Sequence, residues 1–204
     1  MMRRGQAAAA AGMLALVLAP QVASQFRPGL HAWLIDHWAL TWDLAWREPW
    51  RVVLSPLVQP RPGLVGTEWL FALAVVPAFA VLWPARLMPL GFWGADAAGT
   101  WPTLLGLRVA AEWSSHAARL LGDPDAGSSA GLFGLALMAA WRLQRTPAAG
   151  VVAGIVIFAA GRLAIFHRVF DIEHALAVGT VTLLLWLTQG PPGRARARAA
   201  ETAP

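Results

Sequence analysis

Apolar residues along this chain gather in six blocks long enough to span, or nearly span, a bilayer. A helix needs about 20 predominantly apolar residues to cross a bilayer, with a range of roughly 17–25. The pattern therefore predicts an all-α, polytopic membrane domain over residues 1–190, built as a bundle of six transmembrane helices. The predicted spans are Ala7–Ser24, Leu64–Trp83, a segment between Leu87 and Leu121, Gly127–Leu143, Ala148–Phe166 and Phe170–Gln189.

The third span has two possible placements. One is Trp101–Leu121, which contains Arg108, Glu112 and His116 at four-residue spacing. Such a polar stripe must face the interior of the bundle, because ionisable groups are costly in lipid. The other placement begins earlier, contains Asp96 and leaves the stripe in an outer loop.

The first block also has features of a secretory signal. Arg3 and Arg4 precede a short apolar run, and residues 22–24 read VAS, which resembles a cleavage site. Removing this block would leave five spans and invert the arrangement of arginines across the membrane. We therefore favour a retained first span.

A long segment, Gln25–Gly63, separates the first two spans and is rich in tryptophan. Trp38, Trp42, Trp46 and Trp50 recur at four-residue intervals. This spacing predicts that their indoles share one helical face until Pro49 disturbs the helix. Indole rings favour the headgroup region, where the ring is half dry and the N–H reaches water. The segment is predicted to lie amphipathically in the outer interface, and a plain anchoring belt of tryptophans is the alternative.

Composition supports the membrane assignment and excludes several classes of site. The chain has 204 residues, 57% of them hydrophobic and 13% charged. The absence of cysteine excludes disulfides, thiolate metal sites and a cysteine nucleophile. All sixteen basic residues are arginines, and they lie between apolar blocks rather than on one polar element, so no nucleic-acid partner is expected.

The positions of the arginines predict the orientation. With six spans and a cytoplasmic N-terminus, eight arginines fall in segments on the cytoplasmic side. This agrees with the excess of basic residues in the cytoplasmic loops of membrane proteins. These arginines are Arg3, Arg4, Arg86, Arg142, Arg145, Arg194, Arg196 and Arg198. Both termini are thus expected in the cytoplasm, and residues 191–204 form an Arg-rich tail that is predicted to be disordered and able to touch anionic lipid.

One serine and one histidine fall at matching depth in this topology. Asp125 lies at the outer end of the fourth span, which puts Ser129 about one turn inside it, roughly 6 Å at 1.5 Å per residue. His174 has the corresponding position in the sixth span, which runs in the same direction. A serine hydroxyl needs a positioned base to take its proton, and a neutral imidazole can do so. Ser129 and His174 are therefore a candidate nucleophile and base.

The same residues also admit packing and ligand interpretations. Gly127 and Gly131 have the four-residue spacing of small residues that let membrane helices pack closely, and His174 could simply partner a buried group such as Glu112. A small channel or transporter using the stripe of Arg108, Glu112 and His116 lacks the paired broken helices expected of that class. No spacing supports a haem or metal site among His116, His167 and His174, so no cofactor or metal is expected.

Several motifs together resemble those of the rhomboid intramembrane serine proteases. Residues 127–134 read GSSAGLFG, and residues 125–131 fit D-x-G-x-S-x-G. The pair Trp50-Arg51 precedes the second span, and GADAAGT at 94–100 is similar to the turn between spans two and three in that family. In order and spacing, the chain is closest to the divergent bacterial rhomboid-like proteins. The resemblance implies a location in a bacterial inner or plasma membrane.

The resemblance implies roles for further residues. Ser129 and His174 would be the catalytic dyad. For the oxyanion, this chain itself offers Gln59, His116 or the Ser129 backbone N–H as substitute donors, with Gly127 as a further supporting residue. If the sixth span begins early enough, Asp171 lies on the same helical face as His174 and would orient its ring, although the family does not require a third member. Gly131, Gly134 and Ala177 would bring spans four and six together. The implied activity is cleavage of transmembrane protein substrates near the outer face, without metal or cofactor.

The chain departs from the family pattern at three places. Between Leu64 and Trp83 it has neither the histidine nor the asparagine of the usual H-x-x-x-N. Glu173 stands before His174 where the family has alanine, and Ala177 stands where it has glycine. Loss of one oxyanion donor can lower a rate by about 10²–10³-fold. The alternative function is therefore a catalytically inactive rhomboid-like protein that binds or escorts client membrane helices.

Overall fold

The computed structural model describes residues 2–27, 29–61, 68–143 and 145–192, and in these ranges the chain is all-helical, without a β-strand. The longer helices are α1 (Arg4–Phe26), α5 (Glu68–Leu82), α6 (Met88–Ala110), α8 (Ser129–Trp141), α9 (Arg145–Phe166) and α10 (Val169–Gln189). The shorter ones are α2 (Leu30–Trp38), α3 (Trp42–Arg47), α4 (Arg51–Leu54), η1 (Ser55–Leu57), η2 (Ala85–Leu87) and α7 (Ser115–Gly122).

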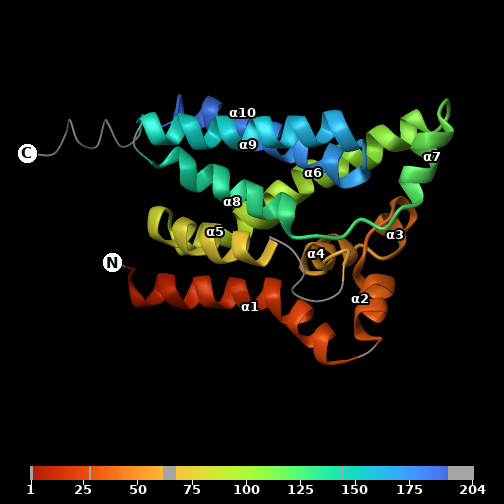
Figure 1. Cartoon of the computed structure of the whole chain (residues 1–204), viewed down its shortest axis with the longest axis horizontal. Coiled ribbons are helices and arrows are strands. Elements are labelled where there is room, and N and C mark those ends of the chain that lie inside the picture. Colours follow the sequence, from red (N-terminus) through yellow and green to blue (C-terminus); the bar gives the residue numbers. More distant parts are fainter. Residues whose placement is uncertain (1, 28, 62–67, 144, 193–204) are drawn as a thin grey trace, which may run out of the picture.

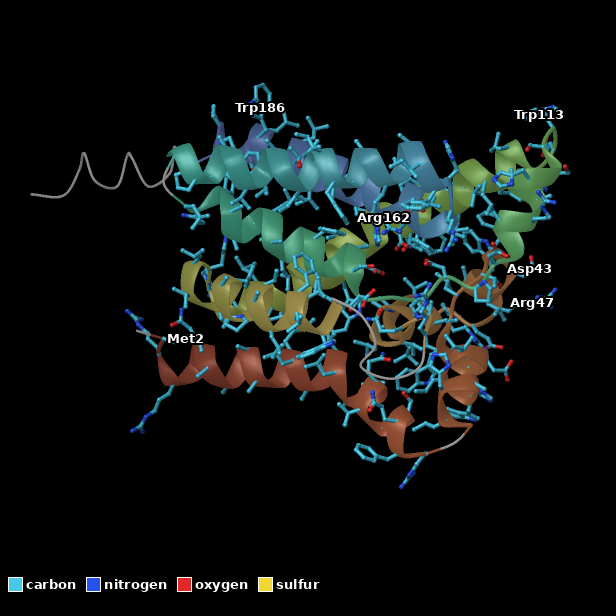
Figure 2. The ribbon with its side chains drawn as sticks, in the orientation of Figure 1. Met2, Asp43, Arg47, Trp113, Arg162 and Trp186 are labelled. Carbon is cyan, nitrogen blue, oxygen red and sulfur yellow. The ribbon has the colours of Figure 1, made fainter. Side chains whose placement is uncertain are left out.

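The long helices lie along one axis of the molecule, and the short ones gather at one end of it. Figure 1 shows α1, α5, α8, α9 and α10 side by side, with α2, α3, α4 and α7 at the end where α8 and α10 begin. In Figure 2, Asp43, Arg47 and Trp113 mark this end, while Met2 and Trp186 mark the opposite one. The first residues of α8 and α10 therefore lie at the same end of the bundle.

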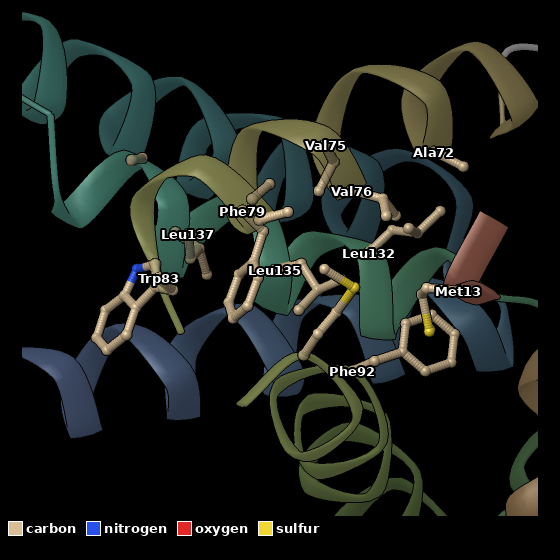
Figure 3. Close-up of a cluster of buried hydrophobic side chains, with 14 of the residues drawn as sticks. Met13, Ala72, Val75, Val76, Phe79, Trp83, Phe92, Leu132, Leu135 and Leu137 are labelled. Atoms are coloured by element: carbon tan, nitrogen blue, oxygen red, sulfur yellow. The ribbon is translucent and has the colours of Figure 1, made fainter. Parts of the chain in front are cut away.

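A hydrophobic core joins the first half of the bundle to the second. Val76 and Phe79 of α5 and Leu135 and Leu137 of α8 are fully buried, and Met13 of α1 reaches the same cluster (Figure 3). Between helices in lipid, such side chains stabilise the bundle by close van der Waals packing. Helix α1 is thus packed into the bundle rather than lying apart from it.

Small residues on α6 let two other helices approach it closely. Gly91, Ala95 and Gly99 recur at four-residue intervals, which places them on one helical face. The carbonyl oxygen of Gly91 lies 3.1 Å from the Cβ position at Gly134 of α8, and Ala95 also contacts Gly134. A Cβ at Gly99 would lie only 2.6 Å from the carbonyl oxygen of Glu173 in α10. Helix α6 is therefore the common support of α8 and α10.

Three helices in the described part of the chain are long and apolar enough to cross a membrane: Arg4–Phe26, Pro147–Phe166 and Val169–Gln189. Helices α5 and α8 are apolar but shorter. Side chains such as Ile157 and Leu187 are largely exposed, as expected where a helix faces lipid rather than protein. These helices indicate a membrane protein that is all-helical in the described ranges.

The third apolar segment follows the earlier of the two predicted placements. Helix α6 begins at Met88 and contains Asp96, so the stripe that begins at Arg108 does not line the bundle interior. Arg108 and Glu112 are exposed and form an ion pair of 3.5 Å. Residues 94–100, predicted as a turn, are helical, because η2 makes the connection after α5 and the small residues here pack within α6.

The tryptophan segment is not one continuous amphipathic helix. Helix α2 ends at Trp38, and α3 starts at Trp42 after a break. In the break, the backbone of Leu40 exchanges two hydrogen bonds with that of Asp125, of 2.8 Å and 2.7 Å. This pairing needs extended backbone and so interrupts the predicted single face of indoles. Trp46 and Trp50 are nevertheless more than half exposed.

Candidate active site

The structure brings the predicted nucleophile and base together. Ser129 is the first residue of α8, and His174 lies in the second turn of α10. Ser129 Oγ lies 2.6 Å from His174 Nε2, within the range expected of a nucleophile and its base. The neutral imidazole accepts the serine proton at Nε2 when its own proton is on Nδ1.

The backbone before Ser129 is held by two segments from the first third of the chain. Asp125 pairs with Leu40, and the Gly127 N–H donates to the carbonyl oxygen of Ser55 at 3.2 Å. Gly127 has φ of +143°, a conformation that favours glycine over residues with a Cβ. Gly127 therefore shapes the turn that puts Ser129 at the start of α8, and its contribution is to the backbone.

Gln59, which was expected to support the oxyanion, reaches the same turn. Its Nε2 donates to Ser128 Oγ at 2.6 Å, and Ser128 is fully buried. Gln59 Oε1 and Ser129 Oγ each lie 3.6 Å from the Cβ position at Gly127. The side-chain amide of Gln59 is thus a neighbour of the candidate nucleophile.

The start of α8 offers further hydrogen-bond donors. The N–H groups at the beginning of a helix have no partner within it. Among the described residues, the N–H groups of Ser129, Ala130 and Gly131 have no acceptor, and Ser128 caps none of them with its side chain. They carry the positive end of the helix dipole, which stabilises negative charge.

A pocket of about 570 Å³ opens beside the dyad. Its lining combines phenylalanine rings with polar and charged groups and comes from α5, α8, α9, α10 and the segment around Gln59. The lining residues are Gln59, Pro60, Arg61, Glu68, Phe71, Ala126, Ser129, Phe133, Phe158, Arg162, Arg168, Phe170 and His174. Pockets of this size, mostly apolar with a few converging polar groups, are typical of binding sites.

Asp171 does not orient the imidazole, so that prediction is wrong. Its carboxylate accepts from Arg162 Nε at 2.8 Å and from the Arg168 N–H at 3.3 Å. His174 Nδ1 is buried and has no partner within the described ranges. The ring instead lies against Phe133 and Phe170, with centroids 5.3 Å and 6.2 Å away.

Three buried carboxyl groups lie behind the dyad, a feature that the sequence analysis missed. Asp96 of α6, Asp125 and Glu173 of α10 are each at most 7% exposed. Thr100 Oγ1 donates to Glu173 Oε1 at 2.6 Å, and the Asp125 carboxyl lies next to Glu173. Burial raises the pKa of Asp125 from 3.8 to about 6, while the side-chain contact with Glu173 lowers it.

These three residues did leave a signal in the sequence. Asp96 lies in an apolar block, Asp125 begins the glycine-rich stretch, and Glu173 replaces a family alanine. Charged residues in apolar segments usually face the protein interior and meet one another. Without the true position of α6, however, nothing in the sequence placed Asp96 next to the other two.

His116 is remote from the pocket, so its predicted support of an oxyanion is wrong. It lies exposed on α7, and its Nδ1 is 3.4 Å from Arg119 Nη2. Of the predicted pair Trp50-Arg51, Trp50 is exposed, whereas Arg51 is buried and holds the segment before it together. Its guanidinium donates to Glu48 Oε2 and to the carbonyl oxygens of Asp36 and Ala39 at 2.7, 2.7 and 3.0 Å.

Gly131, Gly134 and Ala177 were predicted to pack α8 against α10, but each of them packs against α6. Gly131 faces Phe92 of α6, whose ring lies 2.6 Å from the Cβ position, and Gly134 also faces α6. The Cβ of Ala177 is 3.0 Å from the Cβ position at Gly99 of α6. These residues therefore bring α8 and α10 together indirectly, because each helix packs on α6.

In the residues that the structure describes, no group of three His, Asp or Glu side chains is arranged to hold a metal ion. Searched against protein families, curated proteins and solved structures, the chain finds no match.

Proposed function

We propose that this protein is an intramembrane serine endopeptidase of the rhomboid type, with Ser129 as nucleophile and His174 as general base. The observation that carries the proposal is the 2.6 Å approach of Ser129 Oγ to His174 Nε2 at the edge of a pocket. The motif resemblance around Ser129 and His174 supports the same reaction.

In this mechanism Ser129 Oγ attacks the scissile carbonyl carbon while its proton passes to His174 Nε2. The tetrahedral intermediate collapses by breaking the C–N bond, and the imidazolium returns the proton to the leaving amine. A water molecule then attacks the acyl-enzyme ester and loses its proton to the same nitrogen. The carboxylic acid product leaves, and the serine recovers its proton.

The oxyanion would be stabilised by groups other than the usual pair of the family. The free N–H of Ser129 at the start of α8 is one donor, with the helix dipole behind it. The second is Gln59 Nε2, which donates to Ser128 Oγ in the absence of substrate. Rotation of this amide toward the pocket would exchange that acceptor for the oxyanion.

The long helices α1, α5, α6, α8, α9 and α10 serve as six spans, with both termini in the cytoplasm. The dyad then lies near the outer face, where water can reach it through the pocket. The substrates are transmembrane proteins whose helices unwind near that face. The lipid bilayer is the only other partner, and the reaction uses no metal or cofactor.

The proposal is tested by labelling the purified protein in detergent with a fluorophosphonate. Labelling is expected for the wild type and to be lost in Ser129→Ala and His174→Ala. The exposed residues of α7 supply matched controls, Ser115→Ala and His116→Ala, which keep full labelling. Labelling that survives Ser129→Ala would remove the proposed nucleophile.

A second function, binding of client helices without cleavage, is favoured by one observation. Glu68 is the only titratable side chain in the described helix α5, which has neither His nor Asn where the family holds its oxyanion donors. An inactive protein would show no fluorophosphonate labelling and no cleavage of any transmembrane test substrate, while still binding helices.

A further inference from the structure

Arginines outnumber carboxylates among the residues that line the pocket beside the dyad. Three arginines line it, Arg61, Arg162 and Arg168, against the single carboxylate of Glu68. Arg162 comes from α9 and Arg168 from the residue before α10, whereas Glu68 begins α5. In Figure 2, Arg162 lies inside the bundle, near the place where α8 begins.

Arg162 is held in a fixed position with part of its guanidinium unused. Its Nε donates to Asp171 Oδ1 at 2.8 Å, and the Asp171 side chain is fully buried. Three phenylalanine rings lie within 6 Å of its Cζ: Phe158 at 5.9 Å, Phe166 at 5.2 Å and Phe170 at 5.6 Å. Among the described residues, its two Nη groups donate no hydrogen bond. Such a guanidinium presents a planar fork to an anion at little further cost in entropy.

Arg168 brings a second cation to the same place. Its Cζ lies 5.8 Å from the centroid of the Phe170 ring. The guanidinium groups of Arg162 and Arg168 therefore both contact this ring. The Asp171 carboxylate also accepts from the Arg168 N–H, which ties this residue to the support of Arg162. Arg162 is paired with Asp171, whereas Arg168 has no ion-pair partner among the described residues, so the two arginines together retain positive charge for an anion.

From this arrangement we propose that Arg162 and Arg168 bind a carboxylate of the substrate, an Asp or Glu side chain near the scissile bond. This specificity rests on the function proposed above. The ligand is assigned to the polypeptide rather than to a lipid headgroup because Ser129 and His174 line the same pocket. A group bound to these arginines therefore belongs to the molecule that is attacked.

The test compares matched transmembrane substrates that carry Asp, Asn or Lys at one position near the cleavage site. The position of this residue is varied along the segment around the scissile bond. For the wild type, kcat/KM is expected to be about tenfold or more higher with Asp than with Asn, because charge-assisted hydrogen bonds are roughly twice as strong as neutral ones. Lys is expected to be the poorest. Equal rates for the three substrates at every position would overturn the inference.

Charge reversal gives the sharper result. Arg168→Glu is expected to favour the Lys substrate over the Asp substrate, and Arg162→Gln to abolish the preference. Arg168 is exposed, so its substitution leaves the fold intact even if Arg162→Gln disturbs Asp171. The control Arg119→Glu, on α7 and outside the pocket, keeps the preference for Asp.

Two further measurements separate the inference from the proposed function. Fluorophosphonate labelling of Arg168→Glu that equals the wild type, with an unchanged preference for Asp, would overturn the carboxylate site and leave the protease intact. Binding of the fluorescent Asp, Asn and Lys peptides to Ser129→Ala in micelles reports the site even without cleavage. Tighter binding of the Asp peptide, lost in the double variant with Arg168→Glu, supports it.

A lipid ligand has its own signature. If the arginines bind a headgroup, Arg168→Glu will slow cleavage of all three substrates equally. The wild-type rate will then depend on the phosphatidylglycerol content of the vesicles rather than on the substrate residue. That outcome would overturn the assignment of the site to the substrate.

Discussion

His174 is buried between two phenylalanine rings, and only one of its ring nitrogens has a partner. The Ser129 hydroxyl lies at Nε2, while Nδ1 faces no acceptor in the described part of the chain. An imidazole in this setting is positioned by packing against the rings rather than by a carboxylate. His174 therefore fits a Ser–His dyad, in which packing orients the imidazole as a third residue does in a triad.

The Asp125 carboxyl predicts a particular pH dependence of stability. Its pKa of about 6 lies above the ordinary 3.8, so the folded protein keeps a proton that the unfolded chain has already lost between these values. Its contribution to the free energy of unfolding is complete below about pH 4 and falls as pH rises toward 6. Helix α6 presents Asp96 and α10 presents Glu173 to this group, so each ionisation adds a buried like charge.

Thermal unfolding in detergent between pH 4 and pH 8 measures this effect. The midpoint of the Asp125→Asn variant is expected to fall less over this interval than that of the wild type. Asp123→Asn, which changes an exposed carboxylate of the same loop, is the control and keeps the wild-type slope. Identical slopes in wild type and Asp125→Asn would show that Asp125 has no raised pKa.

At the level of elements, α6 decides how α8 and α10 are placed, and its glycines make the closest contacts. Gly99 lies against the backbone of Glu173, next to the histidine of the dyad. Gly94 lies on the same helix with nothing within 4 Å of its Cβ position. The two positions therefore separate the effect of helix packing from that of helix propensity.

Gly99→Ala is expected to lower stability by about 1–3 kcal/mol, because the added methyl overpacks the contact with α10. It should also weaken fluorophosphonate labelling, since a shift of α10 lengthens the distance from Ser129 to His174. Gly94→Ala is expected to be neutral or to stabilise by up to about 1 kcal/mol, as Gly to Ala does in a helix. Unfolding and labelling that respond alike to both substitutions would contradict the role of Gly99.

Hydropathy predicted most of the helices, because the cost of unsatisfied backbone groups in lipid fixes where long apolar helices run. Matched depth also predicted the meeting of Ser129 and His174, since it follows from the direction of two helices. The break at Leu40 was not predictable, because it depends on pairing with Asp125, far along the chain. One of the two predicted placements of the third span missed α6, because Asp96 lowers the hydropathy of that segment. Only tertiary contacts show that the Asp96 carboxyl is buried.

For the whole molecule, the arginine distribution predicts which end of the bundle faces the cytoplasm. The chain has no cysteine, so any single introduced cysteine reports its own position without interference. Ser115→Cys lies on α7, at the end where α8 and α10 begin, and Arg86→Cys lies in η2 between α5 and α6. Each residue is exposed, and neither is part of the pocket.

A membrane-impermeant maleimide applied to intact cells is expected to label Ser115→Cys at once. Arg86→Cys should react only after the membrane is permeabilised, because the arginine distribution predicts that its side of the bundle faces the cytoplasm. The wild-type protein, without a thiol, gives the background. The reverse pattern would invert the proposed orientation and place the dyad near the inner face.

The position of His174 on the last described helix has a consequence for biosynthesis. Ser129 leaves the ribosome before α9 and α10 exist, so its hydroxyl has no base while these helices are still being translated. The dyad forms only when α10 packs on α6, which needs the contact between Glu173 and Gly99. Under the proposed function, a nascent chain would therefore carry Ser129 in an unreactive form, and proteolytic activity would arise only with the completed bundle.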